Sequence, residues 1–135
     1  MDKVVLSTII VIIFAGFLFW ALQSGVFSGT TATPLPVGPL LFYSPDCSHC
    51  KIVEDYIIQN KIDEKVKYAR LEVPFGTRTS PQLESNAKLA IQLAQGCKLD
   101  VTNGISIPLL YDGKGKCLLG QDEVINFFKN EAGIK

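Results

Sequence analysis

The sequence predicts an α/β domain in which a mixed four-stranded sheet carries helices on both faces, and it predicts one transmembrane helix before that domain. Three observations lead to this fold class. Short apolar runs alternate with amphipathic helical patterns over residues 38–135. The order of these patterns is β-α-β, then α, then β-β-α. A long apolar segment without charge precedes them all.

Residues 1–22 are predicted to be a membrane anchor. Residues 4–22 hold 16 apolar residues in 19 and no charge, and a helix of that length reaches about 28 Å, close to the thickness of the hydrocarbon core of a bilayer. A cleaved signal peptide and a buried core helix are the alternatives, but residues 21–23 make a poor cleavage site. Lys3 precedes the span and the next basic residue is Lys51, which favours a cytoplasmic N-terminus and an extracytoplasmic domain.

Residues 23–37 are predicted to be a flexible linker. Nine of these fifteen residues are Ser, Thr, Gly or Pro and none is charged, so the stretch cannot bury enough apolar surface to offset the entropy lost on ordering. The domain then occupies residues 38–135.

The first half of the domain contains the β-α-β pattern. Residues 40–43 are a short apolar run between proline-containing turns and predict a buried strand. Apolar residues at helical spacing predict a helix over residues 47–60. The mixed-sign charges of residues 61–67 predict a solvated loop, and a second strand-like run begins at Val66 and ends near Pro74.

The second half contains a helix, a hairpin and a closing helix. Pro81 suits a first helical turn, and the apolar stripe that follows ends at Gly96. Residues 105–111 and 116–119 flank an Asp-Gly-Lys-Gly turn and predict a hairpin, and the last helix ends at Gly133. A parallel pair from the β-α-β unit and an antiparallel hairpin together make a mixed sheet.

The charge balance excludes one class of partner. The chain has 13 Lys and Arg against 13 Asp and Glu, hence no net charge. A nucleic-acid binder needs a basic excess to contact phosphates, so no nucleic-acid partner is expected.

The sequence Cys47-Ser48-His49-Cys50 lies where the first strand ends and the first helix begins. The leading thiol should therefore face the unpaired N–H groups and the positive end of the helix dipole, which favour thiolate, and protonated His49 adds a further favourable charge. A lower thiol pKa makes that sulfur a better leaving group and the disulfide more oxidising. Such a motif near a β-α-β pattern is typical of a redox site.

Residues 41–51 resemble the active-site strand, turn and helix of the thioredoxin-like superfamily, and Ile107-Pro108 followed by residues 109–111 resembles the cis-proline that opens its third strand. The resemblance implies the thioredoxin-like fold with an exposed nucleophile at Cys47 and a buried resolving thiol at Cys50. It also implies that Pro108, with Ile107, holds substrate backbone beside the sulfurs, and that no cofactor is needed. Small membrane-anchored bacterial proteins of this superfamily and its DsbA-like and vitamin-K-epoxide-reductase-associated domains are similar.

Three departures from thioredoxins proper bear on the redox direction. Ser48-His49 replaces Gly-Pro between the cysteines, Asp46 stands before Cys47, and Leu41 stands where a strand acid is expected. His at the third position resembles oxidases and isomerases, whereas Asp46 beside Cys47 offsets the histidine. We expect a moderately oxidising or isomerising couple between about −270 and about −120 mV.

Other interpretations of the same residues remain open. Cys47, His49 and Cys50 are suitable zinc or copper ligands, although their spacing converges poorly without a fourth ligand, and the cysteine pair could be an inert disulfide. Pro108 could be an ordinary trans proline of an edge strand. Phe75 is expected to pack in the core, with substrate contact as the alternative.

Cys97 and Cys117 are a second pair, expected at the pole of the sheet far from Cys47. A structural disulfide between them would close a loop of about 20 residues, and an extracytoplasmic domain would allow it to persist. Free buried thiols and a redox relay pair are the alternatives.

The function predicted from these features is a membrane-anchored thiol:disulfide oxidoreductase that acts on protein cysteines outside the cytoplasm. A membrane redox partner would recycle the dithiol. The competing class is a copper-handling protein, or a non-catalytic assembly protein, on the same fold.

Overall fold

The computed structural model describes residues 37–135. Their helices and strands follow in the order β1 (Leu40–Tyr43), α2 (Ser48–Gln59), α3 (Ile62–Lys65), β2 (Ala69–Glu72), α4 (Pro81–Gly96), β3 (Leu109–Tyr111), β4 (Cys117–Leu119) and α5 (Gln121–Glu131). The predicted anchor and all but the last residue of the predicted linker lie outside the described residues. From residue 37 onward, every helix is too short or too polar to cross a membrane.

The four strands form one mixed sheet in the order β2-β1-β3-β4. The β1 strand runs parallel to β2, with Leu41 opposite Arg70, and antiparallel to β3, with Leu41 opposite Leu110. The β3 and β4 strands form the antiparallel hairpin that the Asp-Gly-Lys-Gly turn predicts. The predicted α/β class and mixed four-stranded sheet are confirmed, and the topology is consistent with the thioredoxin-like fold.

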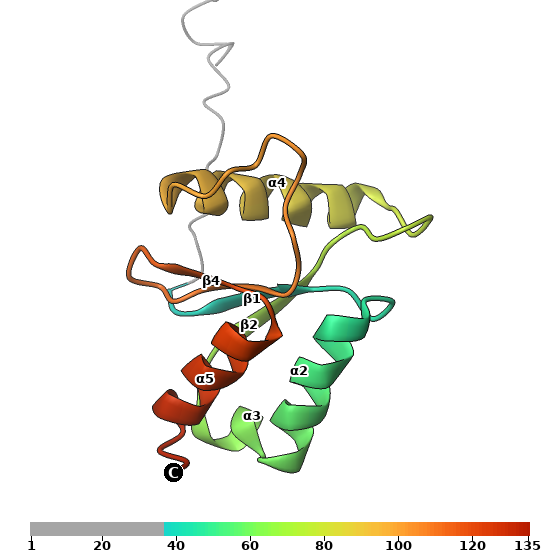
Figure 1. Ribbon diagram of the computed structural model, residues 1–135. Helices are drawn as coiled ribbons and strands as arrows, with labels where there is room; N and C mark the ends of the chain where they lie inside the picture. Colours follow the sequence, from blue (N-terminus) through green and yellow to red (C-terminus); the bar gives the residue numbers. More distant parts are fainter. Residues whose placement is uncertain (1–36) are drawn as a thin grey trace, which may run out of the picture. The chain divides into compact units, whose positions relative to one another are not determined.

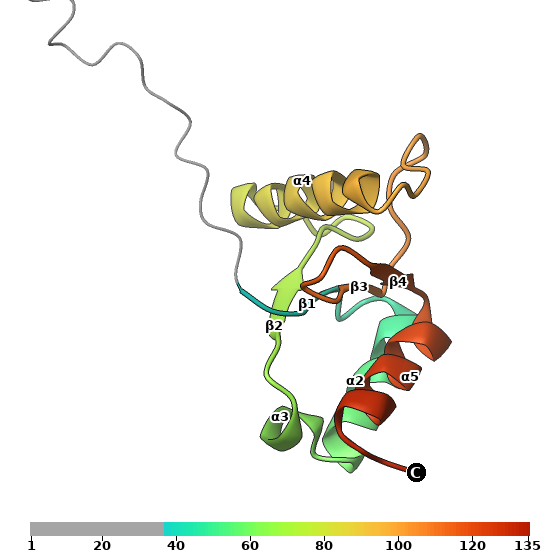
Figure 2. The ribbon, with the colours of Figure 1, turned by 90° about the vertical axis from the view of Figure 1, so that its left-hand side faces the viewer.

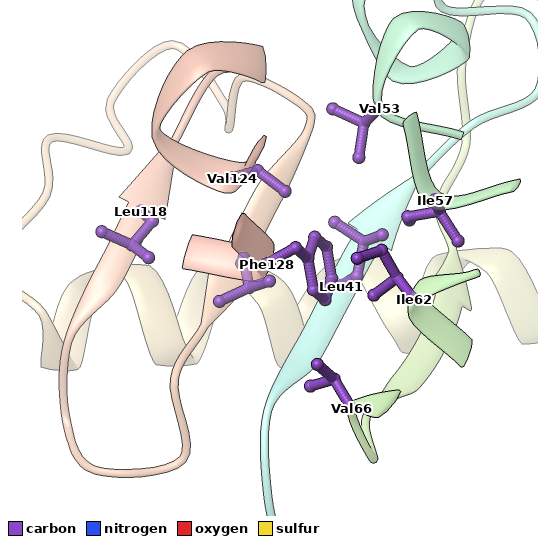
Figure 3. Close-up of a cluster of buried hydrophobic side chains, with 9 residues drawn as sticks. Leu41, Val53, Ile57, Ile62, Val66, Leu118, Val124 and Phe128 are labelled. Atoms are coloured by element: carbon purple, nitrogen blue, oxygen red, sulfur yellow. The ribbon is translucent and has the colours of Figure 1, made fainter. Parts of the chain in front are cut away.

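Helices cover both faces of the sheet because side chains along β1 alternate between the faces. Leu40 and Phe42 pack in the cluster under α4, whereas Leu41 packs in the cluster under α2 and α5. Figures 1 and 2 show α4 on one side of the sheet and α2, α3 and α5 on the other. The buried core of the second cluster, drawn in Figure 3, contains Leu41, Val53, Ile57, Ile62, Val66, Leu110, Leu118, Val124 and Phe128.

The predicted loop at residues 61–67 is wrong in part, because a single helical turn, α3, occupies residues 62–65. Ile62 is fully buried in the cluster under α2 and α5, and this burial stabilises the turn. Lys61 provides the entry with a left-handed backbone at φ 52°. The following strand, β2, therefore begins at Ala69, later than the expected start at Val66.

The α4 helix begins where the sequence predicts. Ser80 is its N-cap, and the Ser80 hydroxyl accepts a hydrogen bond from the N–H of Leu83 at 3.2 Å. Pro81 occupies the first turn, where its missing N–H costs nothing. The loop between β2 and α4 is thereby held at the same end of the sheet as the start of α2.

Cys97 and Cys117 form a disulfide, the pairing that the sequence favours. Cys97 caps the C-terminus of α4, and Cys117 opens β4 opposite Tyr111. Tyr111 in turn pairs with Leu40, at the end of β1 that lies away from Cys47. The bridge therefore joins the α4 layer to the sheet at the pole opposite the first cysteine pair.

Removing this bridge is expected to destabilise the domain by about 3 kcal/mol, because a cross-link across 20 residues restricts the unfolded chain. The Cys97→Ala/Cys117→Ala variant should show that loss in urea unfolding followed by circular dichroism. Equal unfolding midpoints for the variant and the oxidised chain would contradict a structural role for the bridge.

Candidate functional site

Cys47 is placed by a turn at the end of β1 and by the start of α2. Its N–H donates to the carbonyl of Ser44 at 3.2 Å, and Cys47 is the N-cap of α2. The N–H of Cys50 donates to the Cys47 sulfur at 3.4 Å. The sulfur thus replaces the oxygen of an ordinary N-cap side chain, and it lies at the positive end of the helix dipole, where negative charge is stabilised.

Cys50 lies one turn into α2 and is 1% exposed. Burial, followed by the hydrogen bond with Cys47, raises the pKa of the Cys50 thiol to about 12. Glu54, one turn further along α2, adds to the rise through its negative charge. Cys50 therefore stays protonated at neutral pH. Both cysteines are free thiols in this structure.

The segment before β3 brings a backbone carbonyl to the dithiol. The Cys47 thiol lies 3.7 Å from the carbonyl oxygen of Ile107, within hydrogen-bonding reach for sulfur. The Ile107-Pro108 peptide bond is cis, and Pro108 is fully buried. Because the proline ring is covered, Ile107 rather than Pro108 presents its surface beside the sulfur.

A groove of about 950 Å³ opens beside Cys47. Its walls come from the start of α2, the loop after β2, one side of α4, the segment before β3 and the start of α5. The lining residues are Cys47, Ser48, His49, Val73, Pro74, Phe75, Ala87, Ile91, Gly104, Ile105, Ser106, Ile107, Leu119, Gly120, Gln121, Asp122 and Glu123. Most of this surface is apolar, and its acidic residues gather at the start of α5.

Two expectations about exposure are wrong at this groove. Cys47 is only 4% exposed, because the Ile107 carbonyl and the turn before α2 cover most of it. It nevertheless lines the groove, whereas Cys50 does not. Phe75 is 43% exposed and lines the groove instead of packing in the core, because the loop after β2 turns outward at this point.

His49 contacts the first residue of α5. Its Nδ1 lies 2.8 Å from the side-chain oxygen of Gln121, so this nitrogen carries the proton in the hydrogen bond. The contact joins the N-termini of α2 and α5 at the edge of the groove. That His49 tunes the charge on Cys47 stays a prediction, whereas the role of Gln121 as its partner was not foreseen from the sequence.

Arg78 is a second residue that sequence reasoning missed. Its Nε donates to Asp46 Oδ2 at 2.8 Å, and its Nη1 lies 3.5 Å from Glu72 Oε1. Asp46 therefore has a cationic partner. The sequence shows the charge of Asp46 next to Cys47, but not this partner. An isolated arginine in a loop expected near the dithiol was the available signal.

The alternative of a metal site at Cys47, His49 and Cys50 has no support from the grouping of side chains in the part of the chain that the structure describes. Over residues 37–135, no three His, Cys, Asp or Glu side chains are grouped so that they could hold a metal ion. Cys47, His49 and Cys50 are adjacent in sequence, but the His49 ring is engaged with Gln121.

The fold and the site together define an α/β domain with a mixed four-stranded sheet and a Cys-x-x-Cys dithiol at a helix N-terminus, an arrangement consistent with the thioredoxin-like fold. The chain is similar in structure to oxidised glutaredoxin 2 from Chlamydomonas reinhardtii. The sequence identity is 18%, the TM-score is 0.42, and the match covers 70% of this chain and 74% of that one. No protein-family model matches the sequence, and no curated protein matches it significantly.

Proposed function

We propose that this protein is a thiol:disulfide oxidoreductase that acts on protein cysteines through Cys47 and Cys50. The observation that carries the proposal is the position of the Cys47 sulfur. It caps α2, lies beside the Ile107 carbonyl and borders an apolar groove, while Cys50 is buried behind it. A substrate cysteine in the groove would reach the first sulfur and not the second.

In the oxidising direction the domain begins as the Cys47–Cys50 disulfide. A substrate thiolate attacks the Cys47 sulfur, the bond to Cys50 breaks, and Cys50 leaves with the electron pair and takes up a proton. A second substrate thiolate then attacks the substrate sulfur of the mixed disulfide, and Cys47 leaves as thiolate. Two substrate thiols lose two electrons in total, which the reduced dithiol holds until a disulfide or other thiol oxidant removes them.

Two features support net oxidation over reduction. The Cys47 sulfur lies at the N-terminus of α2, where the positive end of the helix dipole favours negative charge, and an interaction that stabilises the reduced form makes a couple more oxidising. Leu41, which is fully buried on β1, supplies no acid at the position where thioredoxins carry one.

Catalysis of exchange is tested by two assays run in parallel on the full chain. Reoxidation of reduced RNase with oxidised glutathione should be accelerated, and reduction of insulin by dithiothreitol should be accelerated less. Metal content of the same preparation separates the competing class. A stoichiometric metal with no activity in either assay would contradict the oxidoreductase proposal in favour of metal handling.

Resolution by Cys50 is expected to depend steeply on pH. Because the Cys50 pKa is about 12, the thiolate fraction rises about tenfold for each pH unit up to that value. Reduced protein mixed with oxidised glutathione should release its second glutathione at a rate that climbs in the same way from pH 6 to 9. Acid quenching followed by mass spectrometry measures the mixed disulfide. A rate that levels off at pH 8 would contradict a raised Cys50 pKa.

We also propose that residues 1–22 anchor the domain outside the cytoplasm, where a membrane redox partner recycles the dithiol. The support is the uncharged apolar segment and the placement of Lys3 and Lys51. The full chain should remain in the membrane pellet after carbonate extraction, whereas a chain starting at residue 23 should not. A membrane-impermeant alkylating reagent should label Cys47 in intact cells, and no labelling until the cells are lysed would contradict the orientation.

A further inference from the structure

Arg78 joins three segments at the dithiol end of the domain. Its guanidinium contacts Asp46 in the turn before α2 and Glu72 at the end of β2. The Glu72 Oε1 atom is buried and has no hydrogen-bond partner, so the 3.5 Å approach of Arg78 is its charge compensation. The Arg78 backbone exchanges two hydrogen bonds with Phe75, which closes a turn in the loop whose Phe75 lines the groove.

One partner of this ion pair, Asp46, belongs to the turn that leads into the reactive cysteine. Asp46 immediately precedes Cys47, and an unpaired carboxylate there would oppose a second negative charge on the thiolate. Arg78 offsets that charge, and its hydrogen bond to Asp46 raises the pKa of the guanidinium further above its usual value. Arg78 and Asp46 are both about half exposed, so solvent screens the effect and keeps it modest.

We infer that Arg78 is a positioning residue that compensates the charge of Asp46. It thereby favours the dithiol form of Cys47 and Cys50 and makes the couple a stronger oxidant of substrate thiols. The inference rests on the proposed function, because it assumes that this couple cycles between dithiol and disulfide. Arg78 does not contact the sulfurs; it acts through Asp46 and through the loop that carries Phe75.

The test is the equilibrium of the full chain with glutathione, measured in detergent by alkylation and mass spectrometry. Arg78→Gln should shift this equilibrium about threefold toward the protein disulfide, which corresponds to about 14 mV in the reducing direction. Asp46→Asn should shift it by a similar factor in the opposite direction. The Asp46→Asn/Arg78→Gln variant should lie close to the unmodified chain, because both charges are gone.

The chain offers a matched control in its other arginine. Arg70 makes an ion pair with Asp63 at 2.7 Å, at the end of α2 remote from Cys47. Arg70→Gln should lose that ion pair and leave the glutathione equilibrium unchanged. Arg78→Lys should restore most of the wild-type value, and 1 M salt should shrink the Arg78→Gln shift because it shortens the screening length to about 3 Å.

Two outcomes would overturn the inference while leaving the proposed function intact. Arg78→Gln could match Arg70→Gln, or Arg78→Gln and Asp46→Asn could shift the equilibrium in the same direction, which a purely structural loop contact would produce. If instead the unmodified chain forms no Cys47–Cys50 disulfide with glutathione, the proposed function itself fails.

Discussion

Replacing Cys47 with serine is expected to abolish disulfide exchange, with a loss of about a thousandfold or more in RNase reoxidation. Cys47 is the sulfur that borders the groove, and Cys50 is buried behind it without reaching the lining. A hydroxyl at position 47 cannot form the mixed disulfide, so the remaining buried thiol has no access to substrate.

Cys50→Ser is the matched variant and should behave differently. Cys47 can still attack a substrate disulfide, but no second thiol lies close enough to displace the substrate. A covalent complex should accumulate with a model disulfide substrate, visible on a non-reducing gel and absent in Cys47→Ser. Trapping by Cys47→Ser and not by Cys50→Ser would reverse the assigned roles.

Phe128→Ala is expected to cost about 3 to 5 kcal/mol in the free energy of unfolding, the usual range for removing a buried phenylalanine. The ring is fully buried in the cluster under α2 and α5 (Figure 3). Its centroid lies 4.7 Å from the ring of Tyr68 and 5.5 Å from that of Phe127. The substitution therefore removes both apolar contacts and aromatic pairing.

Phe127→Ala is the control for this substitution, because the neighbouring phenylalanine is only partly buried against the same cluster. Its loss should be well below that of Phe128→Ala in urea unfolding of the oxidised protein. Equal losses for the two variants would contradict the deeper burial of Phe128 in this cluster.

Most of the fold could be predicted from the sequence because local patterns specify it. Residues 40–43 are continuously apolar because the strand is covered on both faces, and Ser80-Pro81 starts α4 through local capping. The short α3 turn was not predictable in the same way. Its charged residues resemble a solvated loop, and only the burial of Ile62 in the tertiary structure stabilises a helix there.

In the candidate site, too, the residues of a local motif could be predicted from the sequence, whereas the long-range contacts could not. Cys47 and Cys50 lie in one contiguous motif at a strand-to-helix junction, so their spacing alone indicates their geometry. Arg78 reaches Asp46 across 32 positions and Gln121 reaches His49 across 72, and no local pattern records such pairings. The low exposure of Cys47 follows from the Ile107 carbonyl above it, which is also a long-range contact.

The reduction potential of the Cys47–Cys50 couple, measured against glutathione on the full chain, tests the central claim most directly. The claim is that these two cysteines form a moderately oxidising redox couple. We expect a disulfide between Cys47 and Cys50 whose potential lies clearly above about −270 mV and at or below about −120 mV. A potential as low as about −270 mV, or the absence of any disulfide between these two residues, would contradict it.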